Sequence, residues 1–186
     1  MATRLLDNGI ESYDFPVQAV TDMAQKNRRI GLGVMGLADL FYQLKLAYNS
    51  PEGIAMGEKL MAAINKEAHA VSRTLAKEKG MFPNYKLSVF AKKKIPMHNA
   101  ALTTVHPTGS ISMFTDCSSG IEPNFALAYV KQDKDGHQYH YFNRYFEAAL
   151  AEAKLTKDAV AKVKDEVVAR GSIAHLTDLP ETLRKT

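Results

Sequence analysis

The spacing of apolar residues predicts a chain built mainly of helices. Between residues 51 and 79, apolar residues recur at intervals of three and four, the period of one face of an α-helix, with one gap at Gly57. Ser50 stands where an N-cap is preferred, and Gly80 followed by Pro83 supplies a left-handed stop and a breaker. The sequence therefore predicts a long helix over residues 51–79.

Further helices are predicted at the start of the chain. Leu5, Leu6 and Ile10 have the spacing of an apolar helix face. Asp14 followed by Pro16 is typical of a second helix start, because proline is tolerated in a first turn where no backbone donor is needed. We expect two helices before residue 31.

Two more helices are predicted near the C-terminus, over residues 143–153 and 157–170. The second has Thr156 as its cap, valines on one face and Gly171 beyond its end. The final stretch LPETLRKT (179–186) shows no obvious closing element.

Two segments have the composition of strands. ALTTVH at 101–106 is short and β-branched, and FALAYVKQ at 125–132 precedes the polar turn DKDG. Strands separated by helices favour an α/β class, but two or three strands cannot complete a parallel sheet. With no linker or internal repeat, the sequence predicts a single, incomplete α/β domain over residues 1–186.

Composition and charge narrow the class of protein. With 186 residues, 46% hydrophobic and 24% charged, the chain is long enough for one domain with a buried core. The net charge of +4 is compatible with an anionic ligand, but it is not the basic stripe of a nucleic-acid binder. One cysteine excludes an internal disulfide, and no apolar run reaches 18 residues. We expect a soluble, cytoplasmic protein with no nucleic-acid or membrane partner and no signal peptide.

The stretch GLGVMG at 31–36 matches the dinucleotide-binding pattern G-x-G-x-x-G. That mechanism needs a buried strand before the glycines, but the preceding AQKNRR is polar. The acidic residue expected further along would be Glu52, which lies in the turn-like YNSPEG. We favour the other interpretation, in which the glycines let a short extended segment and the helix LADLFYQL (37–44) pack closely against their neighbours.

Histidine and cysteine supply only weak candidates for chemistry. His137 and His140 form an H-x-x-H, but no other cysteine or obvious carboxylate accompanies them, so no metal site is expected. Cys117 follows Asp116, whose negative charge disfavours the thiolate that a nucleophile requires. A small packing residue in a turn is the favoured interpretation of Cys117.

The most informative stretch is HPTGSISMFTDCSSGIEP at 106–123, which holds six Ser or Thr residues in eighteen positions. A turn of this composition presents successive backbone N–H groups and hydroxyls, and Gly109 allows close approach of a ligand or a positive φ. Phosphate oxygens need several short donors and no acceptor facing them. The residues alone leave two interpretations open: a phosphate-binding loop, or a turn whose hydroxyls only cap helices.

Two long strings resemble the large subunits of ribonucleotide reductases. They are NRRIGLGVMGLADLFYQLKLAYNSPE (27–52) and NAALTTVHPTGSISMFTDCSSGIEPNFALAYV (99–130), and the ending GSIAHLTDLPETLRK (171–185) is similar to the same family. The resemblance covers nearly the whole chain in the same order, and it is strongest for the adenosylcobalamin-dependent, class II enzymes. It implies a helix-rich fragment of a ten-stranded α/β barrel, from the later part of that barrel.

The resemblance also assigns a role to the hydroxyl-rich loop. In the family, a Pro-Thr-Gly-Ser/Thr-Ile-Ser loop follows a barrel strand and binds the phosphates of the ribonucleotide substrate. Carried over by position, the expected substrate-phosphate-binding residues are Thr108, Gly109, Ser110, Ile111 and Ser112, with Ile111 acting through its backbone. The following SSGIEP (118–123) is expected to support the loop rather than to contact substrate.

The catalytic cysteines of the family are missing from this sequence. The family uses a thiyl cysteine in an Asn-Leu-Cys-x-Glu type of motif and further cysteines as reductants, whereas this chain holds only Cys117, at a variable family position. His98 stands where many relatives have Arg before Asn99. No catalytic residue is therefore assigned. The resemblance implies adenosylcobalamin for the parent enzyme, and we do not expect this chain alone to bind it.

The predicted function is that of one part of a ribonucleotide reductase, which reduces ribonucleoside di- or triphosphates to their 2′-deoxy forms. This chain would contribute the phosphate loop and be inactive alone. The expected partners are the ribonucleotide substrate and either the remainder of the reductase or a second copy of the chain. Two alternatives stay open: a non-catalytic assembly or regulatory module derived from the barrel, and a stand-alone nucleotide-binding protein.

Overall fold

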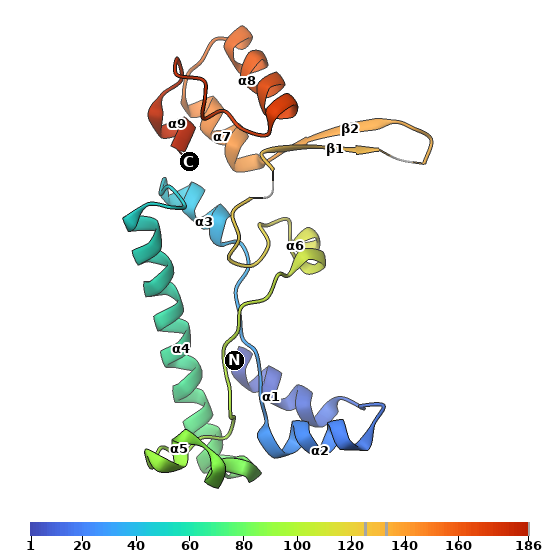
Figure 1. Cartoon of the computed structure of the whole chain (residues 1–186), viewed down its shortest axis with the longest axis vertical. Helices are drawn as coiled ribbons and strands as arrows, with labels where there is room; N and C mark the ends of the chain where they lie inside the picture. Colours follow the sequence, from blue (N-terminus) through green and yellow to red (C-terminus); the bar gives the residue numbers. More distant parts are fainter. Residues whose placement is uncertain (125, 133, 186) are drawn as a thin grey trace. The chain divides into compact units, whose positions relative to one another are not determined.

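Figure 1 shows the computed structural model, which describes residues 1–124, 126–132 and 134–185. The chain divides into two compact units, which are described separately below. Unit 1 comprises Met1–Val34 and Gly57–His106, and unit 2 comprises Met35–Met56 and Pro107–Thr186. Helices predominate, and the named strands of the described residues form one antiparallel hairpin. The expectation of a single domain over residues 1–186 stays a prediction.

Unit 1 is built mainly from helices that end where local capping signals stand. α1 runs over Ala2–Ser12, α2 over Gln18–Asn27 and α4 over Pro51–Lys79, whose residues from Gly57 onward belong to this unit. The helix predicted over 51–79 is confirmed with the same bounds, and Gly80 ends it at a φ of +90°. The helix predicted at the start of the chain is confirmed as α1.

Two short elements complete the helices of unit 1: the 3-10 helix η1 (Pro83–Leu87) and α5 (Val89–Lys92). The helix predicted to start at Asp14–Pro16 begins later, at Gln18, because Val17 is still extended with φ −130° and ψ 125°. One cluster of buried apolar residues in this unit consists of Ile30, Ala68, Phe82, Met97 and Leu102.

Two extended segments run in parallel through this core. The N–H of Leu32 donates to the carbonyl of Leu102 at 2.8 Å, and the N–H of Thr104 donates back to the carbonyl of Leu32 at 3.1 Å. Leu32 and Thr103 form one parallel bridge. The strand predicted over 101–106 is thus reduced to a single bridge, because among the described residues only Leu32 pairs with it in this way.

The glycines of GLGVMG make this close approach possible. A Cβ on Gly31 would lie 2.6 Å from Cγ2 of Thr104, and a Cβ on Gly33 would lie 2.8 Å from the carbonyl oxygen of Thr104. Both distances are shorter than a non-bonded contact of a Cβ atom, so a side chain at either position would push the two segments apart. The interpretation of the glycines as close-packing residues is confirmed for Gly31 and Gly33 in the extended segment.

The first part of unit 2 carries two short helices. α3 runs over Leu37–Leu44, which confirms the helix predicted from LADLFYQL, and α6 runs over Gly109–Thr115 inside the hydroxyl-rich loop. The hairpin follows, with β1 over Ala128–Gln132 and β2 over Gln138–Phe142. The strand predicted over 125–132 is confirmed from residue 128 onward.

Three helices close unit 2: α7 (Arg144–Glu152), α8 (Lys157–Arg170) and α9 (Glu181–Lys185). The hydroxyl of Thr156 accepts the N–H of Ala159 at 3.3 Å, so the predicted cap of α8 is confirmed. One cluster of buried apolar residues in this unit consists of Phe146, Leu150, Val163, Val167, Ile173, Leu179 and Leu183. The expectation that no further element follows in residues 179–186 is wrong. α9 forms there, and Leu179 and Leu183 pack it against this core.

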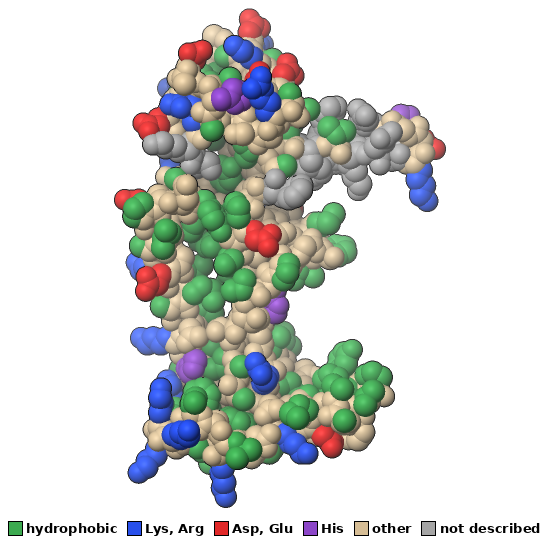
Figure 2. Space-filling view, in the orientation of Figure 1, with side chains coloured by type: hydrophobic (Ala, Val, Ile, Leu, Met, Phe, Trp, Pro, Cys, Tyr) green, Lys and Arg blue, Asp and Glu red, His purple; other side chains and the backbone are tan. Residues whose placement is uncertain are grey.

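The surface of each unit carries one distinctive feature. In unit 1, Lys and Arg side chains gather over α4 and α5, where residues 92–94 are three consecutive exposed lysines (Figure 2). In unit 2, hydrophobic side chains lie on the surface at α6, where Ile111 is 54%, Met113 78% and Phe114 90% exposed (Figure 2). Within the described part of the chain, no helix has the length and apolar character needed to cross a membrane.

Candidate functional site

The hydroxyl-rich loop turns into α6 through an unusual backbone conformation at Thr108. Thr108 precedes the helix with φ +52° and ψ +24°, in the left-handed region that β-branched residues rarely adopt. Gly109, for which a positive φ was one of two expected roles, instead lies in the first turn of the helix. The strained conformation is held by the hydroxyl of Thr108, which accepts the N–H of Gly120 at 2.7 Å.

This hydrogen bond has a consequence for the start of α6. A threonine at an N-cap normally accepts an N–H of the first helical turn, but the side chain of Thr108 makes no such cap bond. The first N–H groups of a helix have no partner within the helix. The N–H groups of Gly109, Ser110 and Ile111 are therefore left available on an exposed turn.

The five predicted phosphate-binding residues lie together on this turn but are not equivalent. The side chain of Ser110 is exposed, whereas Ser112 is 2% exposed. The hydroxyl of Ser112 donates to the carbonyl of Gly109 at 3.2 Å and lies 2.9 Å from the hydroxyl of Ser119. The Ser112 side chain therefore belongs to the fold of the loop, and Ser110 presents the accessible hydroxyl.

The turn 118–123 supports the loop, as the sequence predicted. Ser119 and Gly120 contact Ser112 and Thr108 through the two bonds just described. Ser118 faces the other way and binds Asp39 of α3, with its N–H 2.6 Å from Oδ2. The role of Asp39 in this contact was not predicted from the sequence. The signal that could have found it is a carboxylate inside the otherwise apolar start of LADLFYQL, since a buried charge needs polar partners.

Cys117 packs between small neighbours. Its sulfur lies 3.1 Å from the hydroxyl of Thr115, and a Cβ added to Gly36 would lie 3.5 Å from its Cβ. The preceding Asp116 is exposed and pairs with Arg144 at 3.2 Å. The side chain of Cys117 is half-buried, as a packing residue in a turn would be.

His137 and His140, the H-x-x-H pair, belong to the hairpin of unit 2. His137 lies in the turn of the hairpin, and the side chain of His140 lies outside the described residues. Among the described residues, no group of three or more His, Cys, Asp or Glu could hold a metal ion. In unit 1, His106 is exposed, and its Nε2 lies 2.9 Å from the carbonyl of Gly31.

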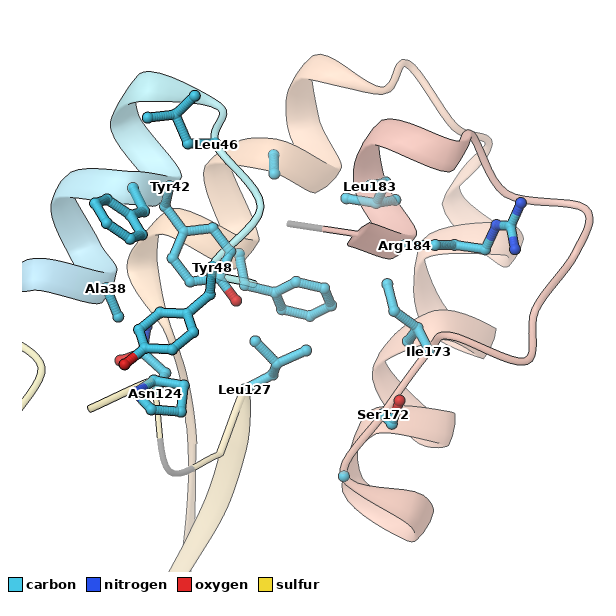
Figure 3. Close-up of a pocket in the computed structure, with 15 residues that line it drawn as sticks. Ala38, Tyr42, Leu46, Tyr48, Asn124, Leu127, Ser172, Ile173, Leu183 and Arg184 are labelled. Carbon is cyan, nitrogen blue, oxygen red and sulfur yellow. The ribbon is translucent and has the colours of Figure 1, made fainter. Parts of the chain in front are cut away.

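Unit 2 also contains a pocket of about 240 Å³ that the sequence did not predict (Figure 3). Figure 3 shows Tyr48 beside Asn124 and Leu127, with the guanidinium of Arg184 turned away from them. Burial raises the pKa of Tyr42, another lining residue, to about 12, and the charge of Asp39 acts in the same direction. The lining comes from five separated stretches of the chain, so no local pattern could reveal it.

Comparison with known proteins places the chain in a family. It matches the family described as ribonucleotide reductase, barrel domain, over residues 1–98 and 91–186. The chain therefore belongs to this family, which confirms the resemblance carried by the two long strings.

Relatives from distant organisms agree with this assignment. A vitamin B12-dependent ribonucleoside-diphosphate reductase of Thermoplasma acidophilum is 44% identical over 161 residues, which are 87% of this chain and 21% of that protein. A protein of the same description from Mycobacterium tuberculosis H37Rv is 35% identical over 184 residues, 99% of this chain and 25% of that protein. The chain thus spans about a quarter of the length of these two relatives.

A solved structure has the same fold over nearly the whole chain. The class Id ribonucleotide reductase alpha subunit of Actinobacillus ureae superposes with a TM-score of 0.71 at 22% identity, covering 98% of this chain and 32% of that subunit. The likeness establishes the fold of this chain as that of part of a ribonucleotide reductase subunit.

Proposed function

We propose that this chain is the part of a ribonucleotide reductase catalytic barrel that holds the phosphates of the substrate. The parent would be a ten-stranded α/β barrel that reduces ribonucleotides to 2′-deoxyribonucleotides. One observation carries the proposal: the hydroxyl of Thr108 is bound to Gly120 and does not cap α6, so the start of that helix keeps its N–H groups for a ligand.

The chemistry of this turn suits an anion. Backbone N–H groups at a helix start point outward and attract negative charge, and phosphate oxygens accept several such donors at once. Gly109 and Ile111 would contribute N–H groups, and Ser110 would contribute both its N–H and its hydroxyl. Thr108 and Ser112 would shape the turn, because their hydroxyls are already engaged within the loop.

Adenosylcobalamin is the cofactor we propose for the parent enzyme, since two relatives are described as vitamin B12-dependent. The pocket lined by Tyr48, Asn124 and Leu127 is about 240 Å³, below the range of about 300–1,000 Å³ typical of drug-sized ligands, so a corrinoid does not fit that pocket. The chain would meet the cofactor as part of the larger enzyme.

Changes at the phosphate loop should weaken substrate binding more than the chemical step. In the reductase that contains this chain, Ser110→Ala removes a hydroxyl from a charged ligand and should raise the substrate KM about tenfold with kcat largely kept. Gly109→Val should have a larger effect. A Cβ at this position would meet nothing within 4 Å in the protein, so the valine would fill only the space of the ligand.

Steady-state kinetics over a range of nucleotide concentrations measures both constants. Ser12→Ala is the matched control, because its exposed hydroxyl bonds only to the carbonyl of Asn8 in unit 1 among the bonds described. The assignment is wrong if neither loop substitution changes KM or kcat.

The purified 186-residue chain should show no reductase activity. Radical abstraction and re-reduction need several cysteines, and this chain has one. The assay incubates the chain with adenosylcobalamin, a dithiol and a ribonucleoside diphosphate, and measures the deoxynucleotide formed. Turnover by the chain alone would contradict the proposal.

The same assay distinguishes the alternative of a non-catalytic module. Adding the upstream part of the barrel with its radical cysteine should restore turnover if the chain completes an enzyme. The exposed apolar side chains of α6 favour such a complement, because Phe114 at 90% exposure gains by burial against another surface. If the two parts bind each other without turnover, a non-catalytic module is the better interpretation.

A further inference from the structure

A reciprocal pair of hydrogen bonds joins the start of α3 to the turn 118–123. The N–H of Ser118 donates to Oδ2 of Asp39 at 2.6 Å, and the N–H of Asp39 lies 3.4 Å from the hydroxyl of Ser118. The carbonyl of Ser118 also accepts the N–H of Gly36 at 2.8 Å. Both side chains are buried, with Asp39 5% and Ser118 7% exposed.

This arrangement is a capping box formed across the chain. In the local form, a Ser or Thr at the N-cap accepts the third N–H of its own helix, and an acidic or amide side chain at the third position accepts the N–H of the cap. Here the N-cap residue is Gly36, which has φ +82° and no side chain to offer. Ser118, 79 residues beyond Asp39, takes its place.

The residues after Ser118 carry this anchor to the phosphate loop. The hydroxyl of Ser119 lies 2.9 Å from that of Ser112, and the N–H of Gly120 donates to the hydroxyl of Thr108 at 2.7 Å. Three consecutive residues therefore join α3 to the start of α6. The second of these bonds engages the hydroxyl of Thr108, which makes no cap bond to its own helix.

We propose that Asp39 is a positioning residue for phosphate binding, an inference that rests on the function proposed above. Without its carboxylate, the buried N–H of Ser118 loses its partner and the turn 118–120 is released. Thr108 can then leave its left-handed conformation for the extended one of an ordinary N-cap, in which its hydroxyl binds the first-turn N–H groups of α6. The donors meant for phosphate would be occupied by the protein itself.

The direction of the change in phosphate affinity distinguishes a positioning role from a purely electrostatic one. Asp39→Ala removes a negative charge from the neighbourhood of an anion site, which by charge alone should tighten the binding of phosphate. Positioning predicts the opposite, a weaker affinity. Asp39→Asn should lie between Asp39→Ala and the wild type, because the amide oxygen still accepts the N–H of Ser118.

The test uses the 186-residue chain with inorganic tripolyphosphate as the probe. Amide NMR titrations give the dissociation constant, and hydrogen exchange reports the protection of the Ser118 and Gly120 N–H groups. We expect Asp39→Ala to weaken binding at least about tenfold, the equivalent of one hydrogen bond to a charged group, and to abolish both protections. Gln43→Ala is the matched control on the same helix, because Gln43 donates to the hydroxyl of Tyr145 and to the backbone carbonyl of Asp39, and neither bond involves the carboxylate of Asp39 or the turn.

Each outcome decides one of the two proposals. Unchanged or tighter binding by a folded Asp39→Ala chain, with both amides still protected, overturns the positioning role. If the wild-type chain binds no tripolyphosphate, the proposed function fails by itself, and amide exchange still decides whether Asp39 holds the turn. If Asp39→Ala does not fold, Asp39→Asn and Ser118→Ala provide the same comparison, since each weakens one half of the reciprocal pair.

Discussion

Replacing Asp7 by Ala should lower the free energy of unfolding of unit 1 by about 3–5 kcal/mol, the usual cost of removing one partner of a buried ion pair. Asp7 is fully buried, and its Oδ1 accepts hydrogen bonds from Nε and Nη2 of Arg28 at 3.0 and 2.9 Å and from Asn99 at 2.8 Å. Its Oδ2 lies 3.3 Å from Nε2 of His98. The substitution would leave the guanidinium of Arg28, itself only 8% exposed, without its main counter-charge.

An exposed ion pair of unit 1, also on α1, provides the control. Arg4 on α1 and Glu78 on α4 meet at 2.7 Å, but both side chains are more than two-fifths exposed. Glu78→Ala should leave stability nearly unchanged, because solvent screens such pairs. Urea denaturation followed by circular dichroism, together with amide exchange in unit 1, measures both variants. Equal losses from the two variants would refute the special weight given to Asp7.

The contribution of Asp7 should also depend on pH. Burial acts to raise the pKa of this carboxyl, but hydrogen bonds from Asn99 and Arg28 and the charges of Arg28 and His98 outweigh it and hold the pKa below its ordinary value of 3.8. A carboxyl whose pKa is lowered by folding stabilises the folded state above its unfolded pKa, and this stability is lost as the pH falls. Wild-type unit 1 should therefore weaken below about pH 4, and Asp7→Ala should weaken less over the same interval.

Phe146→Ala should lower the free energy of unfolding of unit 2 by about 3–5 kcal/mol, through lost burial and the cavity left behind. The ring is 2% exposed and packs with Leu150, Val163 and Val167. Phe114→Ala is the matched control within the same unit, because that ring is 90% exposed and its removal should leave stability nearly unchanged. Amide exchange in α7 and α8 distinguishes the two. A small effect at Phe146 would show that the core of unit 2 is not organised around this side chain.

The helices could be predicted because their signals are local. The bounds of α4 follow from apolar periodicity, a cap at Ser50 and a stop at Gly80, all within one stretch of chain. Where the signal was incomplete, the prediction failed. α9 has only five residues, and Leu179 and Leu183 become a core contact only when α7 and α8 are already in place.

The phosphate loop was also predictable only in part. Its composition and its likeness to the family picked out residues 108–112 without any structure. The division of labour within those residues depended on partners elsewhere: Gly120 for Thr108 and Ser119 for Ser112. No pattern in the sequence predicts which hydroxyls form hydrogen bonds within the fold and which remain available to a ligand.

The sequence by itself determined the longer helices, the caps of α4 and α8 and the family, because each is written in neighbouring residues or in long matching strings. It also predicted the place of the candidate site. The tertiary structure alone decided that the hydroxyl of Thr108 accepts the N–H of Gly120 and that the carboxylate of Asp39 accepts the N–H of Ser118. Hydrogen bonds between residues far apart in the chain form only when folding buries their groups together, and burial makes an unpaired donor costly. This penalty favours the hydrogen-bond partners that the fold brings together. Those partners cannot be predicted from the local order of amino acids.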